Sequence, residues 1–563
     1  MRIRLPLPVF GCAIVVLLSL SAPSFAAHHD ASIQETSLAA KAGKQLLDTF
    51  LVDFDLPAAA ALADARLKQS PRNVDALFVR METAELEERT DLVLDSALRL
   101  CTSGADPELQ ELASNRILQH AANSRPFNSV VPRVKAAAAL NTGCTFNLRL
   151  ALVAAAMDGQ PQIELEHAVH SAGLITRWRM AGPFGKYSNV DFERRWLAEI
   201  DQLARPQYSS SSDKKERADA EVPSLTVERF WFHDGMLSLP DYFPQRGVFY
   251  AAGELDTTYT QPSQLDVLSA GSYAVFIDGK QVLLEDARYS TSPTRNSTVL
   301  QLRPGHHRVL IKFTPDAAPL SLALHPRFSS LESSGALAAS SYIRELNAFF
   351  RGDFLVMDRM LQSESQSKSK TNPAQAQYLR ALLYSAVEEH SAFADAAWKS
   401  LAMAQPAALL ARLKAAESAE GRGQSDEARQ EAMAVMASSP DSESALQLAF
   451  SLVRNETEAP ALLARLLDLH PSCSRLADAV KFYGSTAEQD RARQLEQQMA
   501  TCAPGSLQYA RTLSEAGRHS AAAAYLQQVV VKNPLDRAAR RLLIRQLVLS
   551  GQHKYLLRTS KPG

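Results

Sequence analysis

Six prolines recur at a nearly constant interval along the C-terminal part of the chain. They stand at positions 373, 406, 440, 471, 504 and 534, so the intervals are 33, 34, 31, 33 and 30 residues. Proline ends a helix because it lacks an amide hydrogen and because its ring clashes with the preceding turn. Each interval has room for two helices and a turn, so the spacing predicts a stack of helical hairpins over residues 340–563.

The residues between the prolines fit such hairpins. In the unit that ends at Pro534, Ala510 and Ala522 are small where two helices must approach closely, and Gly517 falls at the turn. The large residues on its facing stripes are Tyr509, Leu513, Leu526 and Val529. The unit that ends at Pro406 uses Tyr378, Ala381, Leu382, Ala394, Trp398 and Leu401, and the next one uses Gly423 and Ala428. This pattern resembles the tetratricopeptide (TPR) repeat. The resemblance implies an α-solenoid that binds a protein or peptide.

A region of different character lies in the middle of the chain. The stretches 271–286 (GSYAVFIDGKQVLLED) and 299–314 (VLQLRPGHHRVLIKFT) each contain two alternating apolar runs around a turn. Asp278-Gly279 supplies the first turn and Pro304-Gly305 the second, which predicts two β-hairpins. Alternation places Tyr273, Val275 and Ile277 together on one face of the first strand.

Further strands are predicted at 227–235, 247–255 and 263–271, with no helix between them. We expect Gly182-Pro183 to end the preceding helical structure. Residues 175–330 therefore read as an all-β sandwich or jelly roll.

Two families resemble this central region. AGSYAVFIDGKQVLL and LRPGHHRVLIKF are similar to carbohydrate-binding-type sandwiches of the protective-antigen or galactose-binding sort. The paired acidic residues that some of those modules carry are missing, so the resemblance does not imply sugar or calcium binding. The order of helical array, segment 173–192, β-module and TPR units resembles the non-catalytic part of secreted bacterial transglutaminase-like proteins. No papain-like catalytic core can be placed in this chain.

The N-terminal part is predicted to be exported and then helical. Residues 1–26 have a basic start, an apolar core and the small-x-small ending Ser24-Phe25-Ala26, which together indicate a cleaved signal peptide. Residues 37–174 show helical periodicity and are expected to form antiparallel helix pairs. Outside residues 1–26, no apolar run is long enough to span a membrane as a helix. The location expected is the periplasm or the exterior of a bacterium.

Four cysteines would remain after cleavage: Cys101, Cys144, Cys473 and Cys502. They have no metal-binding spacing, and an exported chain would form disulfides. The favoured pair is Cys473 with Cys502, because these residues fall at the start and the end of two antiparallel helices. Cys101 with Cys144 is the weaker pair, on the expectation that neighbouring repeats hold these two residues apart.

The sequence contains few candidates for catalysis or for metal binding. Ser365 and Lys368 match SxxK but lie in a polar run. His28 and His29 would follow the cleavage site, where a third-position histidine can bind Cu²⁺ or Ni²⁺, although an unstructured tail is the simpler reading. His306 and His307 should face opposite ways. The remaining single residues considered were Trp231 (sugar stacking or core) and Asn296 and Asn455 (glycosylation acceptors in a eukaryotic host).

These patterns together predict a multidomain α and β protein in which helical-hairpin repeats flank an all-β module. The chain holds 60 basic and 61 acidic residues, and this balance argues against nucleic-acid binding. We expect an exported scaffold that is not an enzyme, uses no cofactor and binds a protein or peptide. The alternatives are glycan binding by the β-module and an accessory role for a separate transglutaminase or hydrolase. A fragment of residues 340–563 is expected to fold alone.

Overall fold

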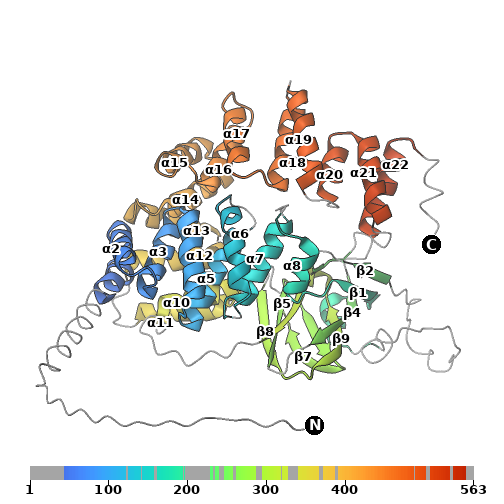
Figure 1. Ribbon diagram of the computed structural model, residues 1–563, viewed down its shortest axis with the longest axis horizontal. Coiled ribbons are helices and arrows are strands. Elements are labelled where there is room, and N and C mark those ends of the chain that lie inside the picture. Colours follow the sequence, from blue (N-terminus) through green and yellow to red (C-terminus); the bar gives the residue numbers. More distant parts are fainter. Residues whose placement is uncertain are drawn as a thin grey trace, which may run out of the picture.

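Figure 1 shows the computed structural model, which combines helices with two antiparallel sheets. The structure describes residues 43–552 apart from 122–124, 141, 158–161, 195, 197–227, 232–234, 240–245, 258–261, 287–293, 319, 327–339, 367–371, 387–390, 487, 503–506 and 533–536. The predicted signal peptide and the polar stretch 207–221 lie outside the described residues.

The N-terminal helices follow a helical segment at 43–50 and stack side by side. Their bounds are α2 Leu56–Gln69, α3 Val74–Leu86, α4 Thr90–Thr102, α5 Pro107–His120, α6 Arg125–Ala138, α7 Thr145–Met157 and α8 Leu165–Ser171. Capping side chains determine where three of these helices begin. Asp55, Asn73 and Asp106 accept hydrogen bonds from backbone amides in the first turns of α2, α3 and α5. This agrees with the helical reading of this region.

The β-domain, residues 175–326, follows α8 directly. Its elements are β1 Arg177–Phe184, α9 Ser188–Asp191, β2 Glu228–Trp231, β3 Met236–Leu237, β4 Val248–Thr257, β5 Ser263–Ser269, β6 Tyr273–Ile277, β7 Lys280–Glu285, β8 Thr294–Leu300, β9 Gly305–Phe313, the short 3₁₀ helix η2 Pro315–Ala317 and β10 Leu320–Pro326. The strand orders are β2-β1-β4-β9-β6-β7 in one sheet and β3-β10-β5-β8 in the other. The described strand pairs within both sheets are antiparallel.

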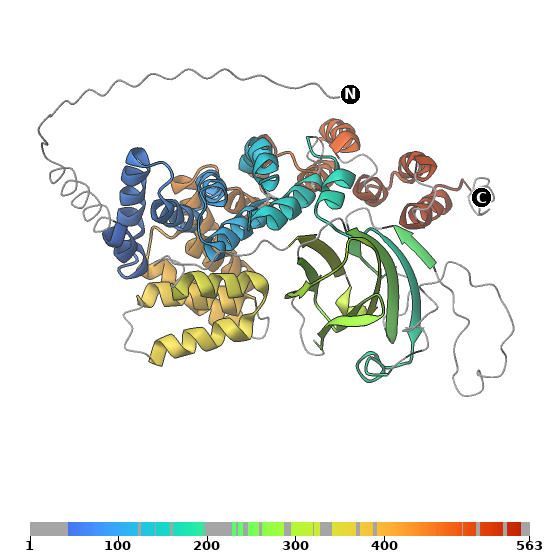
Figure 2. The same cartoon turned by 60° about the horizontal axis from the view of Figure 1, so that its bottom comes forward.

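The two sheets share one apolar core. Tyr273, Val275 and Ile277 lie in it with Leu265 and Val267 from the opposite sheet, as the alternation predicts. The other face of the six-stranded sheet has a smaller apolar cluster. Phe192 and Trp196, from the segment that follows β1 and contains α9, pack with Tyr250 and Ala274 on this face. Figure 2 shows the two sheets facing each other beneath α8.

One of the two predicted hairpins is present and the other is wrong. Asp278 and Gly279 both have positive φ values, 50° and 81°, in the tight turn between β6 and β7. Pro304-Gly305 instead lies where the chain leaves the four-stranded sheet, because β8 pairs with β5 while β9 pairs with β4 and β6. Alternation fixes which face a residue occupies and leaves the pairing partner open. Gly182-Pro183 does not end a helix, since it lies inside β1.

The C-terminal helices begin after the β-domain. Their bounds are α10 Ser341–Arg351, α11 Phe354–Gln366, α12 Pro373–Ser385, α13 Ser391–Ala404, α14 Leu409–Gly421, α15 Ser425–Ser438, α16 Glu443–Leu452, α17 Ala459–Leu469, α18 Cys473–Gly484, α19 Gln489–Cys502, α20 Leu507–Glu515, α21 His519–Lys532 and α22 Arg537–Leu549. The five prolines from Pro406 to Pro534 each follow the second helix of a hairpin, whereas Pro373 opens α12. Gly423 and Gly517 occupy turns between helices with φ of 77° and 73°.

The N-terminal helices and the first C-terminal helices share a single core. That core runs from Leu46 to Ala172 and then from Tyr342 to Ala415. Phe50 and Phe78, for example, lie 5.7 and 6.2 Å from the ring of Tyr342. The described residues from Leu46 to Ala172 therefore share one packed body with those from Tyr342 to Ala415, whereas the sequence pattern suggests two separate helical domains.

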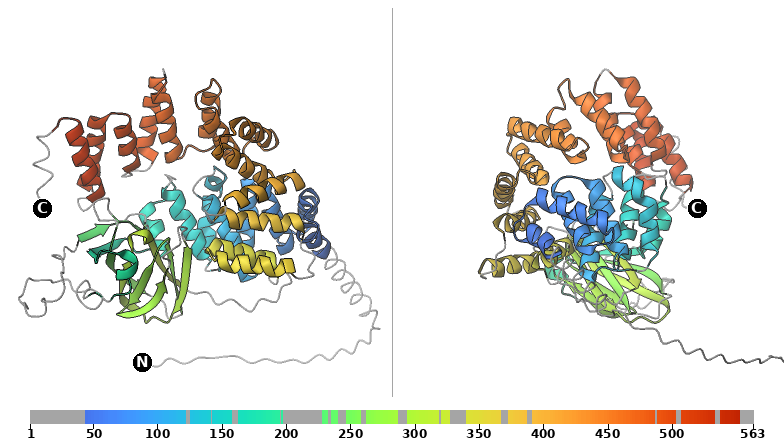
Figure 3. Two further views of the ribbon diagram at one scale, coloured as in Figure 1. Left: turned by 180° about the vertical axis from the view of Figure 1, so that it is seen from behind. Right: turned by 60° about the vertical axis from the view of Figure 1, so that its left-hand side comes forward.

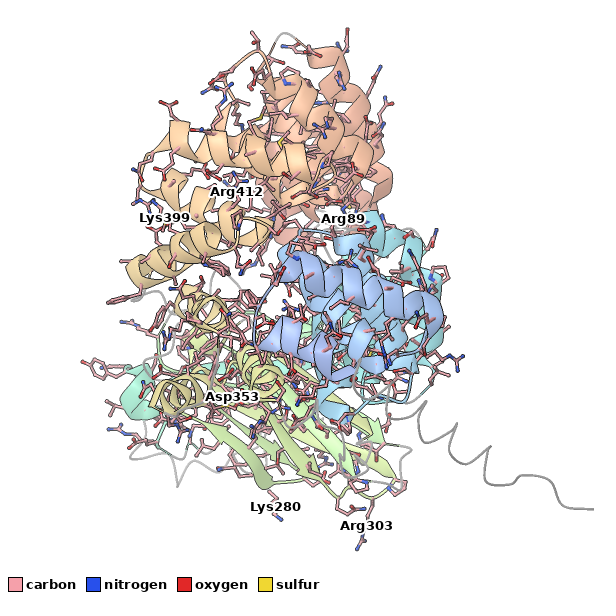
Figure 4. All side chains as sticks on the ribbon, turned by 90° about the vertical axis from the view of Figure 1, so that its left-hand side faces the viewer. Arg89, Lys280, Arg303, Asp353, Lys399 and Arg412 are labelled. Atoms are coloured by element: carbon pink, nitrogen blue, oxygen red, sulfur yellow. A yellow bond between two sulfur atoms is a disulfide. The ribbon has the colours of Figure 1, made fainter. Side chains whose placement is uncertain are left out.

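The later C-terminal helices pack mostly against one another. Residues 409–499 form a second apolar cluster, and residues 510–547 form a third one around α20–α22. Figure 3 shows these helices leaving the packed body as an arm that turns back above α8 and the β-domain. Figure 4 places Lys280 and Arg303 at the opposite end of the β-domain, away from the C-terminal arm.

Candidate functional site

Three of the four predicted cysteines, Cys101, Cys144 and Cys473, take part in disulfides. Cys101, near the end of α4, is bonded to Cys144, the residue before α7, with 5.7 Å between their Cα atoms. The expectation that neighbouring repeats hold this pair too far apart is wrong, because this separation suits a disulfide. Helix α5 packs against both α4 and α7, and this packing brings the two ends together.

Cys473 is also disulfide-bonded. It is the first residue of α18, which packs along α19, and α19 ends at Cys502. The side chain of Cys502 lies outside the described part of the structure, so the pairing of Cys473 with Cys502 stays a prediction.

The two central histidines face opposite ways. His306 is exposed beside Asp256, whereas His307 is buried and both of its ring nitrogens lie 2.7 Å from an oxygen, one on the Asp278 side chain and one on the Arg303 backbone. Burial lowers the pKa of His307, but these two oxygens outweigh it and raise the pKa above its usual value. The His307 ring therefore links β9 to the β6–β7 turn, which is a structural role.

The other single-residue candidates do not assemble into a site. The Asn296 amide donates to the Glu285 carboxylate at 3.0 Å, and Asn455 is exposed between α16 and α17. The side chains of Ser365 and Trp231 and the whole of His28, His29 and Lys368 lie outside the described residues. Among the described residues, no group of three or more His, Cys, Asp or Glu side chains is placed to hold a metal ion.

A cluster of buried polar groups joins the two helical regions. The Arg116 guanidinium on α5 donates two hydrogen bonds, of 3.0 and 2.8 Å, to the Glu82 carboxylate on α3. It also donates to the Tyr378 hydroxyl on α12 at 3.1 Å. The Tyr342 hydroxyl on α10 donates to Glu82 at 3.0 Å. We call these four residues with Glu85 the buried junction.

The buried junction holds two carboxylates and their counter-charges. Glu85 lies 3.2 Å from the Arg116 guanidinium and 2.7 Å from the His120 ring. Burial raises the pKa of Glu85, but Arg116 and His120 outweigh it and lower the pKa to about 2. Because Glu82 and Arg116 are almost wholly buried, a small molecule has no access to them. The arrangement holds helices together and offers no reactive surface.

A second polar contact lies at the edge of the same interface. The backbone of Glu88, in the turn between α3 and α4, has a φ of 57°, and its carboxylate accepts a hydrogen bond of 3.3 Å from Ser442. Ser442 is the N-cap of α16. Burial, together with the nearby charge of Glu85, raises the pKa of Glu88 to about 7. Figure 4 shows the neighbouring Arg89 at this boundary between the N-terminal helices and the arm.

The Glu88 contact predicts a dependence of stability on pH. The pKa of Glu88 is about 7 in the folded chain and near its ordinary value in the unfolded chain, so the folded state binds the additional proton between these values. Stability is thus full below about pH 4.5 and is lost as the pH rises through 7. We expect Glu88→Gln to remove this loss and to stabilise the chain at pH 8. The expected gain is only about 1–2 kcal/mol, because Glu88 is partly exposed and solvent screens its charge.

The measurement is urea unfolding of wild type and Glu88→Gln at pH 5.5 and at pH 8. The free energies of unfolding of the two proteins should differ less at pH 5.5 than at pH 8. Asp358→Asn, at a half-buried residue on α11 away from this contact, is the control. An equal effect of Glu88→Gln at both pH values would refute the assignment.

An open groove lies farther along the arm, between α17 and α19. It has a volume of about 710 Å³. Its apolar floor includes Leu467 from α17, Leu476 from α18 and Leu495 from α19. Leu476 and Leu495 are buried, while Leu467 is half-buried and so faces the open space. Figure 1 labels α17 and α19, which belong to successive hairpins of the arm.

Polar side chains surround the floor of the groove. Glu488, Asp490, Arg491 and Gln494 contribute to its rim. The Arg491 guanidinium is held 4.7 Å above the ring of Tyr483, and Asp490 forms an ion pair of 2.6 Å with Arg493. The half-buried Leu467 with polar groups around it suits a peptide segment that buries one apolar side chain.

Sequence reasoning missed both the buried junction and the groove. Glu82, Glu85 and Arg116 occur at apolar-facing positions of their helices, and such misplaced charges are the one signal of pairing that a sequence offers. The groove left no signal, because it depends on the angle between two successive hairpins.

Comparisons with known proteins identify no family. No family model matches the chain, and no curated protein matches it. Two listed solved structures are an α-xylosidase of family GH31 from Xanthomonas citri (18% identity, TM-score 0.14, 16% of this chain and 11% of that one) and a GH78 rhamnosidase from Bacillus sp. GL1 (12%, 0.14, 53% and 42%). Another is a β-glucosidase from Kluyveromyces marxianus in complex with glucose (12%, 0.16, 27% and 16%).

The chain spans less than half the length of each of these structures. At TM-scores this low, the likenesses carry no conclusion about fold or function. Within the described residues, no helix combines the length and the apolar character needed to cross a membrane.

Proposed function

We propose that this chain is an exported, non-enzymatic scaffold that binds a protein or peptide through TPR-like hairpins of its C-terminal arm. The groove between α17 and α19 carries the proposal, because it joins an apolar floor to a polar rim on an exposed part of the arm. In this proposal the β-domain is a sandwich that holds the arm in place. The disulfide-bonded cysteines support export, since such bonds persist in oxidising compartments.

The test is photocrosslinking from the groove in the exported, full-length protein. A crosslinking amino acid at Gln494 should capture one partner, and the same amino acid at Lys280 should not capture it. Leu467→Ala should weaken the partner's affinity about tenfold, because truncating an apolar contact residue typically costs 1–2 kcal/mol. Leu355→Ala, which removes an exposed leucine on α11, should leave the affinity unchanged.

The opposite pattern would reject the groove. Capture from Lys280 alone, or equal affinities of the Leu467→Ala and Leu355→Ala variants, would place binding elsewhere. Binding of a glycan by the chain, with no dependence on Leu467, would favour the β-domain as the binding module.

A further inference from the structure

The charges of this chain are distributed unevenly. Residues 503–563 contain ten arginines and lysines and only two acids, so they carry +8, whereas the net charge of the whole chain is −1. The acids are Glu515 and Asp536. Glu515 forms an ion pair with Lys481 at 2.6 Å, so it does not offset the arginines of α22. The last 61 residues of the sequence are therefore strongly basic.

Helix α22 concentrates this charge. It contains four arginines at positions 537, 540, 541 and 545 and no acidic residue. Its inner side, with Ala539, Leu543 and Leu547, is buried in the apolar cluster that it shares with α20 and α21. Its outer side is exposed. We define the outer face of α22 as Arg541, Ile544, Arg545, Val548 and Leu549.

The outer face of α22 is amphipathic in its own right. Ile544, Val548 and Leu549 are 39, 48 and 50% exposed. Ile544 and Val548 are four residues apart and so lie on one side of the helix, and Leu549 follows Val548. A cavity of about 370 Å³ lies at the Leu549 end and is lined by residues 517–521 in the first turn of α21. The N-terminus of a helix is partly positive, so this cavity adds to the basic character of the surface.

We propose that the outer face of α22 docks an acidic amphipathic helix of a partner protein. Each of α12, α14, α16, α18 and α20 packs against the helix that follows it, and no described helix follows α22. A helix in the corresponding place would set its apolar side on Ile544 and Val548. Glutamates or aspartates beside that side would pair with the arginines. This surface is separate from the groove between α17 and α19, so the two proposals can fail independently.

Three other occupants fit the surface less well. A second copy of this chain would place one basic face against another. The residues after Gln552 carry Lys554, Arg558 and Lys561 and no acid, so they do not complement the arginines either. An anionic lipid surface matches the charge, but three apolar residues on one helix bury too little apolar surface to insert into a membrane. Docking of a partner helix needs only such a stripe of apolar residues.

The test uses a synthetic helix of 21 residues with leucines at i, i+3 and i+4 spacing and glutamates elsewhere. Binding to the full-length protein is measured by fluorescence anisotropy at 50 and 500 mM salt. We expect saturable binding that weakens with salt. An isomer with its leucines spread around the helix and an analogue with lysines in place of glutamates should not bind.

Variants locate the binding. Arg541→Glu combined with Arg545→Glu should weaken binding at low salt by about tenfold or more, since two attractive pairs become repulsive. Val548→Glu should also weaken it, and Arg511→Glu on α20 should change it less than twofold. Circular dichroism and thermal unfolding of each variant confirm that the fold is kept.

Three results would overturn the proposal. The first is equal binding of the acidic helix by wild type and the double arginine variant. The second is binding to phosphatidylglycerol vesicles, abolished by the same variant, with no binding of the peptide. The third is peptide binding that appears only when residues 553–563 are removed, which would identify that segment as the occupant.

Discussion

Replacement of Arg116 by methionine is expected to destabilise the chain more than any other single substitution considered. The methionine fills similar space but leaves Glu82 and Glu85 buried without their guanidinium partner. Breaking one side of a buried ion pair in this way typically costs about 3–5 kcal/mol. The Tyr378 hydroxyl loses its hydrogen bond from Arg116 at the same time, whereas the Tyr342 hydroxyl still donates to Glu82.

The measurement is urea unfolding followed by tryptophan fluorescence. Trp398 is buried with its ring 6.1 Å from Tyr378, so its emission should report loss of the buried junction. The matched control is Arg429→Met, because Arg429 pairs with Glu456 and Glu458 on the surface of the arm. We expect that control to unfold like wild type. Equal stability of the two variants would show that the junction does not hold the helices together.

A further variant separates charge from packing. Adding Glu82→Gln and Glu85→Gln to Arg116→Met removes the uncompensated negative charges. Part of the lost stability should return, because neutral groups are less costly to bury than unpaired carboxylates. No recovery would indicate that lost packing of the guanidinium, which lies 5.3 Å from the ring of Phe350, dominates the effect.

The same interface bears on one sequence-based expectation, which stays a prediction. Hairpin repeats contact mainly their neighbours, which suggests that residues 340–563 fold alone. In the structure, however, α10 and α12 bury Tyr342 and Tyr378 against α3 and α5. A contact between residues 262 positions apart, such as Arg116 with Tyr378, leaves no trace in the local pattern of either helix.

Local signals did predict many of the elements. Gly517 provides the positive φ that the α20–α21 turn needs, and Ala510 and Ala522 are fully buried as expected for a close helix contact. The Asp278-Gly279 turn was predicted for the same reason, since few other residue pairs adopt its backbone. These signals act over a few residues, so they predict where elements begin and turn.

Pairing between distant elements was predicted poorly. Pro304-Gly305 looks like a hairpin turn because strands stand on both sides, yet the two strands belong to different sheets. The groove between α17 and α19 depends on how two hairpins are angled, and the face of α22 depends on which helix is left uncovered. Both candidate surfaces are properties of tertiary arrangement, which composition and periodicity do not encode.

Removal of the disulfide between Cys101 and Cys144 should have the second large effect. The bond closes a loop with a sequence separation of 43 residues around α5 and α6. In the entropic model, opening a loop of this size costs about 4 kcal/mol of stability, because the unfolded chain regains its freedom. Both cysteines are almost fully buried, so alanine replaces them without exposing a polar group.

The experiment compares urea unfolding of wild type with Cys101→Ala/Cys144→Ala in the absence of reductant. The double variant should unfold at a lower urea concentration, and reductant should shift the wild type in the same direction. Cys473→Ala/Cys502→Ala serves as the comparison, because Cys473 is disulfide-bonded and lies outside the core that holds Cys101. If Cys101→Ala/Cys144→Ala unfolds at the wild-type midpoint, the bond adds nothing, and packing of α4 against α5 and α6 alone holds these helices.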